Sequence, residues 1–332
     1  MINIAVIGAG NWGKNHIRTF AGMKEVNLKY VCDIDEKKFH HIKASYPYIE
    51  VTQNPEDIYR DESVDGVVIV TSSETHFPLA KAALEYNKDV FVEKPLTLDS
   101  QSSEVLVNTT REKKKILMVG HLLIYHPAVL KIKEFINSGE LGDIYYLYSQ
   151  RLNLGSIRRT ENSLWSLGPH DISVALYLLD DEPCTVAAYG DSYIQSDVND
   201  VVFLNLHFPG KKMANIHLSW LDPHKIRKIT IVGSRKMVVF DDMEVREKIR
   251  IYDKGVDNLN NLSSNEYISL RFGDVLIPKL DTIEPLKNEA SHFIDCIKTR
   301  KNPVTDGENG LKVIKILEKA EKSLRKHNGK EE

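Results

Sequence analysis

The chain has 332 residues, of which 42% are hydrophobic and 27% are charged. This length and composition are typical of two globular domains and argue against a disordered or fibrous protein. Lys and Arg number 44 against 47 Asp and Glu, so no bulk positive charge attracts nucleic acid, and we expect a small-molecule partner.

The cysteines and the lengths of the apolar runs narrow the class of protein further. Cys32, Cys184 and Cys296 show neither a disulfide pattern nor a metal-ligand spacing, which favours a reducing cytoplasm. No apolar run approaches the roughly 20 residues that span a bilayer. The run Ile2–Ile7 lacks the basic leader of a secretion signal. We therefore expect a cytoplasmic protein with no membrane segment and no bound metal.

Residues 1–120 alternate short apolar runs with stretches of helical spacing. Runs rich in Val and Ile suit strands that are buried on both faces, and the helices between them serve as crossovers. The fold class predicted for this domain is therefore α/β, with a doubly wound parallel sheet of the Rossmann type. Its predicted strands are Ile2–Ile7, Leu28–Cys32, Gly66–Val70, Asp89–Val92 and Ile116–Val119.

Beyond residue 120 the pattern changes to successive strands without helices between them. Residues 121–332 are predicted to form a second α/β domain on a large, mainly antiparallel open sheet, which binds substrate and makes oligomer contacts. The predicted helices are Pro127–Asn137, Pro169–Leu179, Pro285–Thr299 and Gly307–Leu324. The predicted strands are Ile144–Leu152, Val186–Tyr193, Val201–Phe208, Met213–Trp220, Ile226–Val232 and Lys236–Phe240, and residues 253–276 have no assignable pattern.

Gly8, Gly10 and Gly13 form the pattern G-x-G-x-x-G between a predicted strand and a helix. The first glycine permits a tight turn, the second lets a pyrophosphate approach the backbone, and the third allows close helix packing. The helix N-terminus adds N–H groups and a positive dipole, so this loop, which includes Asn11 and Trp12, is predicted to bind a dinucleotide. A glycine-rich turn without a ligand is the alternative.

Asp33 ends the second predicted strand, about 20 residues after the glycine loop. An acid there accepts hydrogen bonds from both hydroxyls of the adenine ribose and repels a 2′-phosphate, so we predict NAD as the cofactor rather than NADP. Asp35, Lys37 and Lys38 lie close enough in sequence to modify this preference. Capping of the following helix is the alternative role of Asp33.

Lys94, within Glu93-Lys94-Pro95, follows a predicted strand and so lies at the carboxyl edge of the parallel sheet, where open α/β sheets bind ligands. An ammonium group there can stabilise an alkoxide as an alcohol loses hydride, or polarise a ketone in the reverse direction. On spacing alone, a surface lysine before a turn proline is an equally good interpretation.

Over nearly its whole length the chain resembles the glucose-fructose oxidoreductase, inositol dehydrogenase and rhizopine-catabolism (Gfo/Idh/MocA) family. The resemblance rests on the glycine motif, Thr71 with His76, Glu93-Lys94-Pro95, and Leu-Gly-Pro-His-Asp at 167–171. It implies that Lys94 takes part in the chemistry and that Thr71, His76, Glu93 and Lys94 line the cofactor. It also implies that His170 exchanges the substrate proton.

His170 is chemically suited to this role, because an imidazole with a reference pKa of about 6.5 gains and loses a proton near neutrality. A histidine hydrogen-bonded in a helix cap is the alternative. Many members of the family have an acidic residue four positions earlier, where this chain has Ser166, and Asp171 should point to another side of the helix. We therefore predict a pair of Lys94 and His170, and the sequence does not support a triad that includes a carboxylate.

Polar residues near His170 in sequence are candidates for binding the substrate. Arg158 and Asn162 lie in the segment that enters the helix of His170, and arginine suits a carboxylate or phosphate. Tyr125 is a candidate for another wall of the pocket. A solvated loop is the alternative interpretation of Arg158, and packing at the domain junction is that of Tyr125.

Within the family, Asn153-Leu154-Gly155, Asn162 and Leu164-Trp165 resemble members that act on nucleotide-linked sugars for surface polysaccharides. The resemblance implies hydride transfer at a secondary alcohol or ketone of such a sugar, for example C3 oxidation of UDP-N-acetylglucosaminuronate. An inositol, polyol or free-sugar dehydrogenase is the alternative, and an NAD-sensing regulator without turnover is an alternative of another class. The large sheet, with few helices to cover it, predicts a homodimer or homotetramer.

Overall fold

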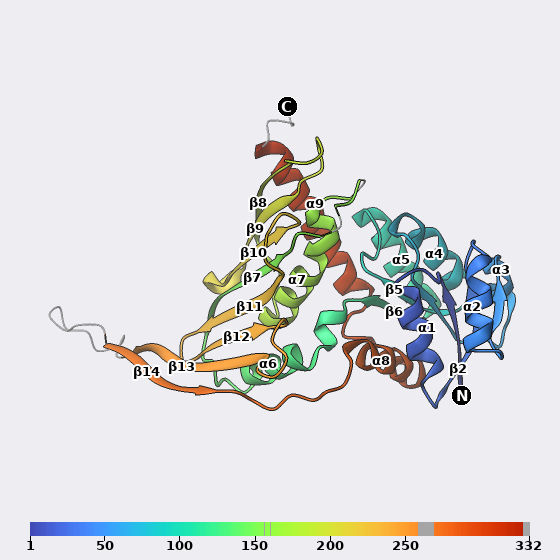
Figure 1. The fold of residues 1–332 in the computed structure, drawn as a ribbon, viewed down its shortest axis with the longest axis horizontal. Coiled ribbons are helices and arrows are strands. Elements are labelled where there is room, and N and C mark those ends of the chain that lie inside the picture. Colours follow the sequence, from blue (N-terminus) through green and yellow to red (C-terminus); the bar gives the residue numbers. More distant parts are fainter. Residues whose placement is uncertain (156, 160, 258–268, 328–332) are drawn as a thin grey trace. The chain divides into compact units, whose positions relative to one another are not determined.

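The computed structural model describes the chain except for residues 156, 160, 258–268 and 328–332. The chain divides into two compact units (Figure 1), Met1–Tyr125 with Ile283–Lys315, and His126–Thr282 with Ile316–Glu332. A single boundary was predicted at residue 120. Each unit instead receives a second, C-terminal piece. Helix α8 (Pro285–Thr299), for example, packs Phe293 and Ile297 beside Gly66 of the N-terminal sheet.

The N-terminal unit is built on a six-stranded sheet in the order β3-β2-β1-β4-β5-β6, with every neighbouring pair parallel. This is the strand order of a Rossmann fold, as the sequence predicts. The strand missing from the prediction, β3, has 3 residues and no fully buried side chain, so it leaves little pattern to detect. The strands are β1 (Ile2–Ile7), β2 (Val26–Cys32), β3 (Glu50–Thr52), β4 (Gly66–Ile69), β5 (Asp89–Glu93) and β6 (Leu117–Gly120).

Helices cover both faces of this sheet. Successive residues of β5 point to opposite faces, so Phe91 stacks edge-on against Phe293 of α8, while Val90 joins a core that includes Leu84 and Leu106 of the helices on the other face. This double burial explains the continuous Val-rich and Ile-rich runs in the sequence. The helices of this part of the chain are α1 (Gly13–Ala21), α2 (Lys37–Ser45), α3 (Pro55–Arg60), α4 (His76–Glu85) and α5 (Ser100–Lys113).

The C-terminal unit is built on an eight-stranded sheet in the order β14-β13-β12-β11-β7-β10-β9-β8. Its neighbouring strands are antiparallel except for β7 and β10, which confirms the predicted large, mainly antiparallel sheet. Of the unassigned residues 253–276, the described ones contribute to β13 and β14, and 258–268 lie outside the described residues. The strands are β7 (Ile144–Leu152), β8 (Thr185–Asp191), β9 (Val201–His207), β10 (Met213–Ser219), β11 (Ile226–Gly233), β12 (Met237–Asp241), β13 (Ile249–Asp257) and β14 (Ser269–Leu276).

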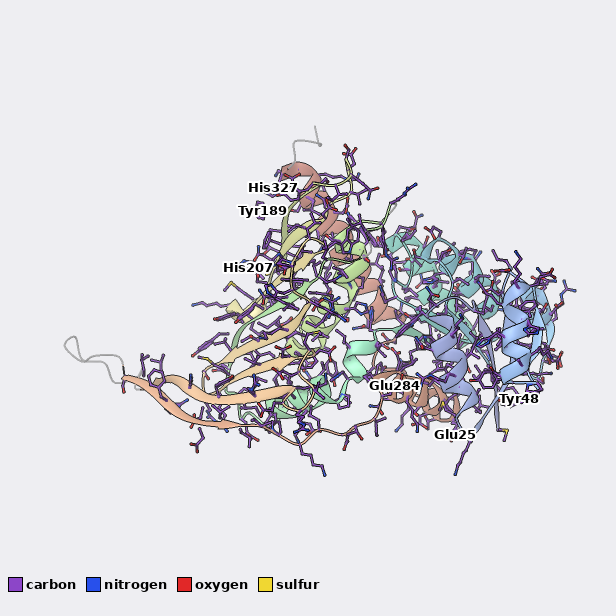
Figure 2. The ribbon with its side chains drawn as sticks, in the orientation of Figure 1. Glu25, Tyr48, Tyr189, His207, Glu284 and His327 are labelled. Atoms are coloured by element: carbon purple, nitrogen blue, oxygen red, sulfur yellow. The ribbon has the colours of Figure 1, made fainter. Side chains whose placement is uncertain are left out.

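Helices α6 (Pro127–Asn137), α7 (Ser163–Leu179) and the end of α9 (Gly307–His327) pack on this sheet. At the end of α9 the ring of His327 lies 4.2 Å from that of Tyr189 on β8 (Figure 2). The start predicted for α7, at Pro169, was wrong, because Asn162 caps the helix and Pro169 lies inside it. The described helices include none that is long and apolar enough to cross a membrane.

The eight-stranded sheet also carries a row of solvent-exposed aromatic and apolar side chains, which we call the open face. Along β7, exposed Tyr146 and Tyr148 alternate with buried Leu147 and Ser149, so the two tyrosines point away from the buried side. In register on the neighbouring strands, Met213 pairs with Tyr146. The open face comprises Tyr146, Tyr148, Phe203 and Met213, which are 38% to 43% exposed in the single chain.

Candidate cofactor and catalytic site

The carboxyl ends of the N-terminal strands lie level with one another. Ile7 of β1 pairs with Cys32 of β2 and with Ile69 of β4, and Glu93 of β5 pairs with Gly120 of β6. The residues that follow these strands therefore gather at one edge of the sheet, which is where open α/β sheets bind ligands. They are Gly8, Asp33, Thr71, Lys94 and His121, of which all but His121 were predicted as site residues.

The packing of the glycine loop requires two of its glycines. Gly8 has a φ of +102°, and a Cβ there would lie 2.4 Å from the carbonyl oxygen of Val70. A Cβ on Gly13 would lie 2.1 Å from the carbonyl oxygen of Gly8. Both positions therefore exclude any larger residue, whether or not a ligand is bound.

Gly10 is different, because a Cβ built there meets no atom within 4 Å. The fold alone does not require a glycine at this position. The first helical hydrogen bond joins Lys14 N to Gly10 O at 3.1 Å, so the N–H groups of exposed Asn11 and Trp12 precede the helical ladder. Open space beside a helix N-terminus fits the close approach of a pyrophosphate.

Asp33 is tied to the glycine loop and to the start of α2. One carboxylate oxygen accepts from Ala9 N at 2.7 Å and the other from Asp35 N at 2.9 Å, while Lys38 Nζ lies 2.9 Å from each. Burial works to raise the pKa of Asp33, but these donors outweigh it and lower the pKa. The acid is therefore an anion at neutral pH and is fixed in place at the carboxyl edge.

Glu93 connects the glycine loop to the lysine. Its carboxylate accepts from Trp12 Nε1 at 2.5 Å, contacts His16 Nε2 at 2.7 Å and accepts from Lys94 N at 3.1 Å. Burial opposes ionisation of Glu93, yet the hydrogen bonds from His16 and Trp12 and the charge of Lys94 lower its pKa. Glu93 is thus a buried anion that fixes the position of the Lys94 backbone. Lys94 itself is half-buried, and its bond to Pro95 is cis.

His76 also contacts the segment Glu93-Lys94-Pro95. It is 1% exposed, and its Nδ1 lies 2.7 Å from the carbonyl oxygen of Pro95. Burial lowers the pKa of His76, so the neutral ring donates from Nδ1 to that carbonyl. Thr71 is more exposed, and its Oγ1 accepts from Thr75 Oγ1 at 2.7 Å.

Three buried groups around Glu93 were missed in the sequence: His16, His121 and Glu289. Burial lowers the pKa of His121 to about 4, so its ring is neutral at neutral pH. Burial and the charge of Glu93 raise the pKa of Glu289 well above its usual value. A carboxyl group on the apolar face of helix 285–299 was the signal that could have found it. The described residues contain no group of three or more His, Cys, Asp or Glu placed to hold a metal ion.

His170 and Asp171 lie in the C-terminal unit, near the middle of α7. Asp171 is 2% exposed and faces β7, where its carboxylate accepts from Ser149 Oγ at 2.5 Å and forms an ion pair with Arg151. Asp171 is therefore committed to holding α7 on the sheet. His170 is half-buried, and Ser166, one turn earlier, is buried.

The residues predicted to bind substrate occupy three different settings. Tyr125 is buried in the N-terminal unit, with its hydroxyl 3.0 Å from Thr305 Oγ1. Asn162 caps α7 through Trp165 N at 3.1 Å and donates to Glu321 at 2.9 Å. Arg158 is 57% exposed at its side chain and pairs with Glu161 at 2.6 Å. The structure thus gives Tyr125 and Asn162 partners within the protein and leaves Arg158 at the surface.

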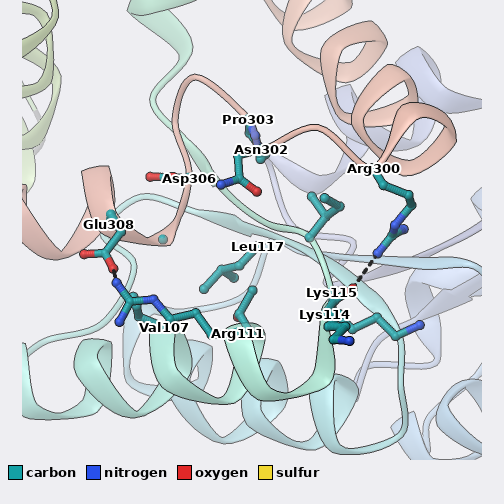
Figure 3. A pocket seen from close by; sticks show the side chains of 13 residues that line it. Val107, Arg111, Lys114, Lys115, Leu117, Arg300, Asn302, Pro303, Asp306 and Glu308 are labelled. Atoms are coloured by element: carbon teal, nitrogen blue, oxygen red, sulfur yellow. Dashed lines mark hydrogen bonds and ion pairs between the residues drawn. The ribbon is translucent and has the colours of Figure 1, made fainter.

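A cavity of about 550 Å³ lies at the opposite, amino edge of the N-terminal sheet (Figure 3). Its lining includes the end of α5, Leu117 at the start of β6 and the segment between α8 and α9. Arg111 pairs with Glu308 there, and Arg300 donates to the carbonyl oxygen of Lys114 at 2.9 Å. None of the predicted site residues lines this cavity, so it is distinct from the predicted cofactor site.

Two family models match the chain. The model described as "Oxidoreductase family, NAD-binding Rossmann fold" matches residues 2–121, and the model described as "GFO/IDH/MocA C-terminal domain" matches residues 129–239. The first match confirms the predicted Rossmann domain and the prediction of NAD as its cofactor. Together the two matches cover most of the chain.

Individual relatives are similar at low identity. Inositol 2-dehydrogenase 2 of Saccharopolyspora erythraea is 29% identical over 65% of this chain and 66% of that protein. UDP-N-acetylglucosamine 3-dehydrogenase of Acidithiobacillus ferrooxidans is 23% identical over 93% of each chain. A solved structure of a UDP-N-acetylglucosamine 3-dehydrogenase from the same organism has a TM-score of 0.83 at 22% identity and 98% coverage of each chain. At that identity the structural similarity shows the fold alone.

Proposed function

Because the chain belongs to the Gfo/Idh/MocA family of oxidoreductases, we propose that it is a dehydrogenase that transfers a hydride between NAD and a secondary alcohol or ketone of a sugar. The observation that carries this proposal is the carboxyl edge of the N-terminal sheet, where the glycine loop, Asp33 and Lys94 gather. Bound NAD supplies the two-electron acceptor or donor of that reaction.

The cofactor-binding residues divide into those that contact the dinucleotide and those that hold them in place. Gly8, Gly10 and Gly13, with Asn11 and Trp12, receive the pyrophosphate, and Asp33 receives the adenine ribose. Thr71 and Lys94 follow their strands at the same edge and line the nicotinamide half. Buried His76 hydrogen-bonds to the carbonyl oxygen of Pro95, and buried Glu93 accepts from Lys94 N. These two contacts fix the position of this edge.

Lys94 and His170 have different roles in the proposed reaction. The ammonium group of Lys94 holds the reacting oxygen and stabilises its negative charge as the C–H bond breaks. His170 takes the proton from the alcohol during oxidation and returns it to the oxygen during reduction.

A nucleotide-linked sugar is the substrate class that we propose, with UDP-N-acetylglucosaminuronate oxidised at C3 as the specific example. The full-length similarity to a UDP-N-acetylglucosamine 3-dehydrogenase supports this class. Arg158, which is exposed and pairs with Glu161, is the residue that we propose to bind an anionic group of the substrate, and Tyr125 and Asn162 remain the other proposed substrate-binding residues. The similarity to an inositol 2-dehydrogenase favours an inositol or polyol as the second candidate.

The experiment that tests this function is nicotinamide absorbance of the purified chain with NAD and a panel of UDP-sugars, UDP-uronates, inositols and polyols. We expect turnover with a UDP-linked sugar and little or none with inositols. Turnover with inositols alone would contradict the proposed nucleotide-linked sugar and would make an inositol the substrate class. NAD binding without turnover across the panel, and without release of bound NADH on denaturation, would favour a regulator that senses NAD.

The open face supports a second proposal, that the protein is a homodimer or homotetramer. Tyr146, Tyr148, Phe203 and Met213 expose apolar surface on adjacent strands, and a contiguous exposed apolar patch is typical of a protein interface. We propose that the same face of a second copy covers it across a two-fold axis.

A further inference from the structure

The carboxylate of Asp33 has its hydrogen-bonding positions filled by the protein itself. Oδ1 accepts from Asp35 N and Lys38 Nζ, and Oδ2 accepts from Ala9 N and Lys38 Nζ, at 2.7 to 2.9 Å. Each carboxylate oxygen has about two acceptor sites. The two hydroxyls of an adenine ribose, which donate to an acid in this position, therefore compete with donors that are already present.

Only one of the competing donors can move at little cost. The N–H groups of Ala9 and Asp35 belong to the backbone of the glycine loop and of the turn before α2. Lys38 reaches Asp33 from the first turn of α2 with a flexible side chain that is 34% exposed. Withdrawal of its ammonium group frees one acceptor site on each carboxylate oxygen, one for each ribose hydroxyl.

The ammonium of Lys38 also changes the charge that a 2′-phosphate meets. An unpaired Asp33 repels that phosphate, whereas the contact pair of Asp33 and Lys38 carries no net charge. A lysine displaced from Asp33 remains tethered within a side-chain length and is a cation that can receive the phosphate. The pair therefore weakens the discrimination against NADP that the acid provides.

We propose that Lys38 is a specificity-determining residue of the cofactor site, which competes with the adenine ribose for Asp33 and narrows the preference for NAD over NADP. The proposal rests on the cofactor role of this loop. Lys37 is the matched control, because it is the preceding residue on α2, is exposed and has the same charge, but it hydrogen-bonds to Asp35 through its backbone N.

The test is titration of the purified chain with NADH and with NADPH, followed by nicotinamide fluorescence, with no substrate present. Lys38→Met removes the charge and keeps the length, and Lys38→Gln removes the charge and keeps a donor. We expect both to raise the ratio of the NADPH to the NADH dissociation constant by about tenfold, with less effect at high salt. Lys37→Met should leave the ratio within about twofold of that of the parent.

An unchanged ratio in both Lys38 variants, with NADH still bound, would overturn the role of Lys38 and leave the dehydrogenase proposal intact. If Lys37→Met raised the ratio by the same amount, the effect would be one of general surface charge, and the role of Lys38 would likewise be overturned. If the folded parent bound neither NADH nor NADPH, the proposed function would fail, and the role of Lys38 would fail with it. Thermal melting of each variant distinguishes weaker binding from loss of the fold.

Discussion

Gly13 lies so close to Gly8 that a Cβ on Gly13 would stand 2.1 Å from the Gly8 carbonyl oxygen. Gly10, between them, faces open space. The same motif therefore contains glycines that the fold requires and a glycine that the fold does not require, and substitution separates the two.

Gly10→Ala should leave the stability unchanged or slightly higher, because alanine restricts the unfolded chain and meets no atom in the folded one. Its NAD affinity should fall by at least about tenfold, because the Cβ occupies the space proposed for the pyrophosphate. Gly13→Ala should lower the free energy of unfolding by about 2 kcal/mol or more through overpacking. Denaturant unfolding and NADH titration measure both effects, and equal NAD affinity in Gly10→Ala and the parent would contradict the assigned pyrophosphate position.

The buried ion pair of Asp171 and Arg151 should be essential to the C-terminal unit. Asp171→Ala leaves Arg151 buried without its partner, a change that typically costs about 3–5 kcal/mol. The exposed pair of Lys131 and Glu134 on α6 is the matched control, and Glu134→Gln should cost less than about 0.5 kcal/mol. Urea unfolding gives both values, and similar costs would contradict the proposed role of Asp171.

The carboxylate of Asp242 should make stability depend on pH in the acid range. Burial alone would raise the pKa of Asp242. His126 and Lys248, at 3.5 and 2.8 Å, outweigh burial, and the net pKa is lowered to about 2. A pKa below the unfolded value of about 3.9 means that the stabilisation is complete above about pH 5 and is lost as pH falls toward 2.

Asp242→Asn should therefore be less stable than the parent near neutrality, by about 1 kcal/mol after allowance for solvent screening of a side chain that is 35% exposed. The difference should shrink as the pH falls from about 4 to about 2. Denaturant unfolding at several pH values measures it. A difference that stays constant with pH would show that the contacts of Asp242 do not depend on its charge.

The open face gives the prediction for assembly. Tyr148→Asp places a charge in the middle of the proposed interface and should convert the oligomer to monomers at micromolar concentration. Tyr48→Asp changes an exposed tyrosine of the N-terminal unit, which is labelled in Figure 2, and should leave the assembly intact. Sedimentation velocity distinguishes these outcomes. A parent protein that is already monomeric would contradict the proposed interface.

Much of the fold was predictable because its periodicities are strong. Doubly buried strands such as β1 and one-sided strands such as β7 leave different patterns, and both were predicted with their observed ends. The start of α7 was predicted at the wrong residue, because a proline usually marks the first turn of a helix and Pro169 lies well inside this one. Strands β13 and β14 have little burial to create a pattern, as the exposed side chains of Ser269–Leu276 show.

The parts of the candidate site that lie in a sequence motif were predictable. Contacts between side chains from distant elements were less predictable. The glycine loop, Asp33 and Lys94 follow strands, and their common edge could be predicted from the alternation alone. Sequence spacing does not reveal that Glu93 contacts His16 or that Glu289 on α8 lies near the same carboxylate. It also does not distinguish Lys38, which pairs with Asp33, from Lys37, which does not.

The most direct measurement of the central claim is turnover and NAD binding, in parallel, for Lys94→Ala and His170→Ala with the substrate that the panel identifies. Lys94→Ala should lower turnover by about 100-fold or more, and His170→Ala by roughly 100-fold to 10,000-fold. The His170 variant should also lose a limb of the pH-rate profile that the parent shows, because the group that exchanges the substrate proton is gone. NAD affinity should change little in both, because the glycine loop and Asp33 remain. Near-normal turnover in both variants would contradict the account.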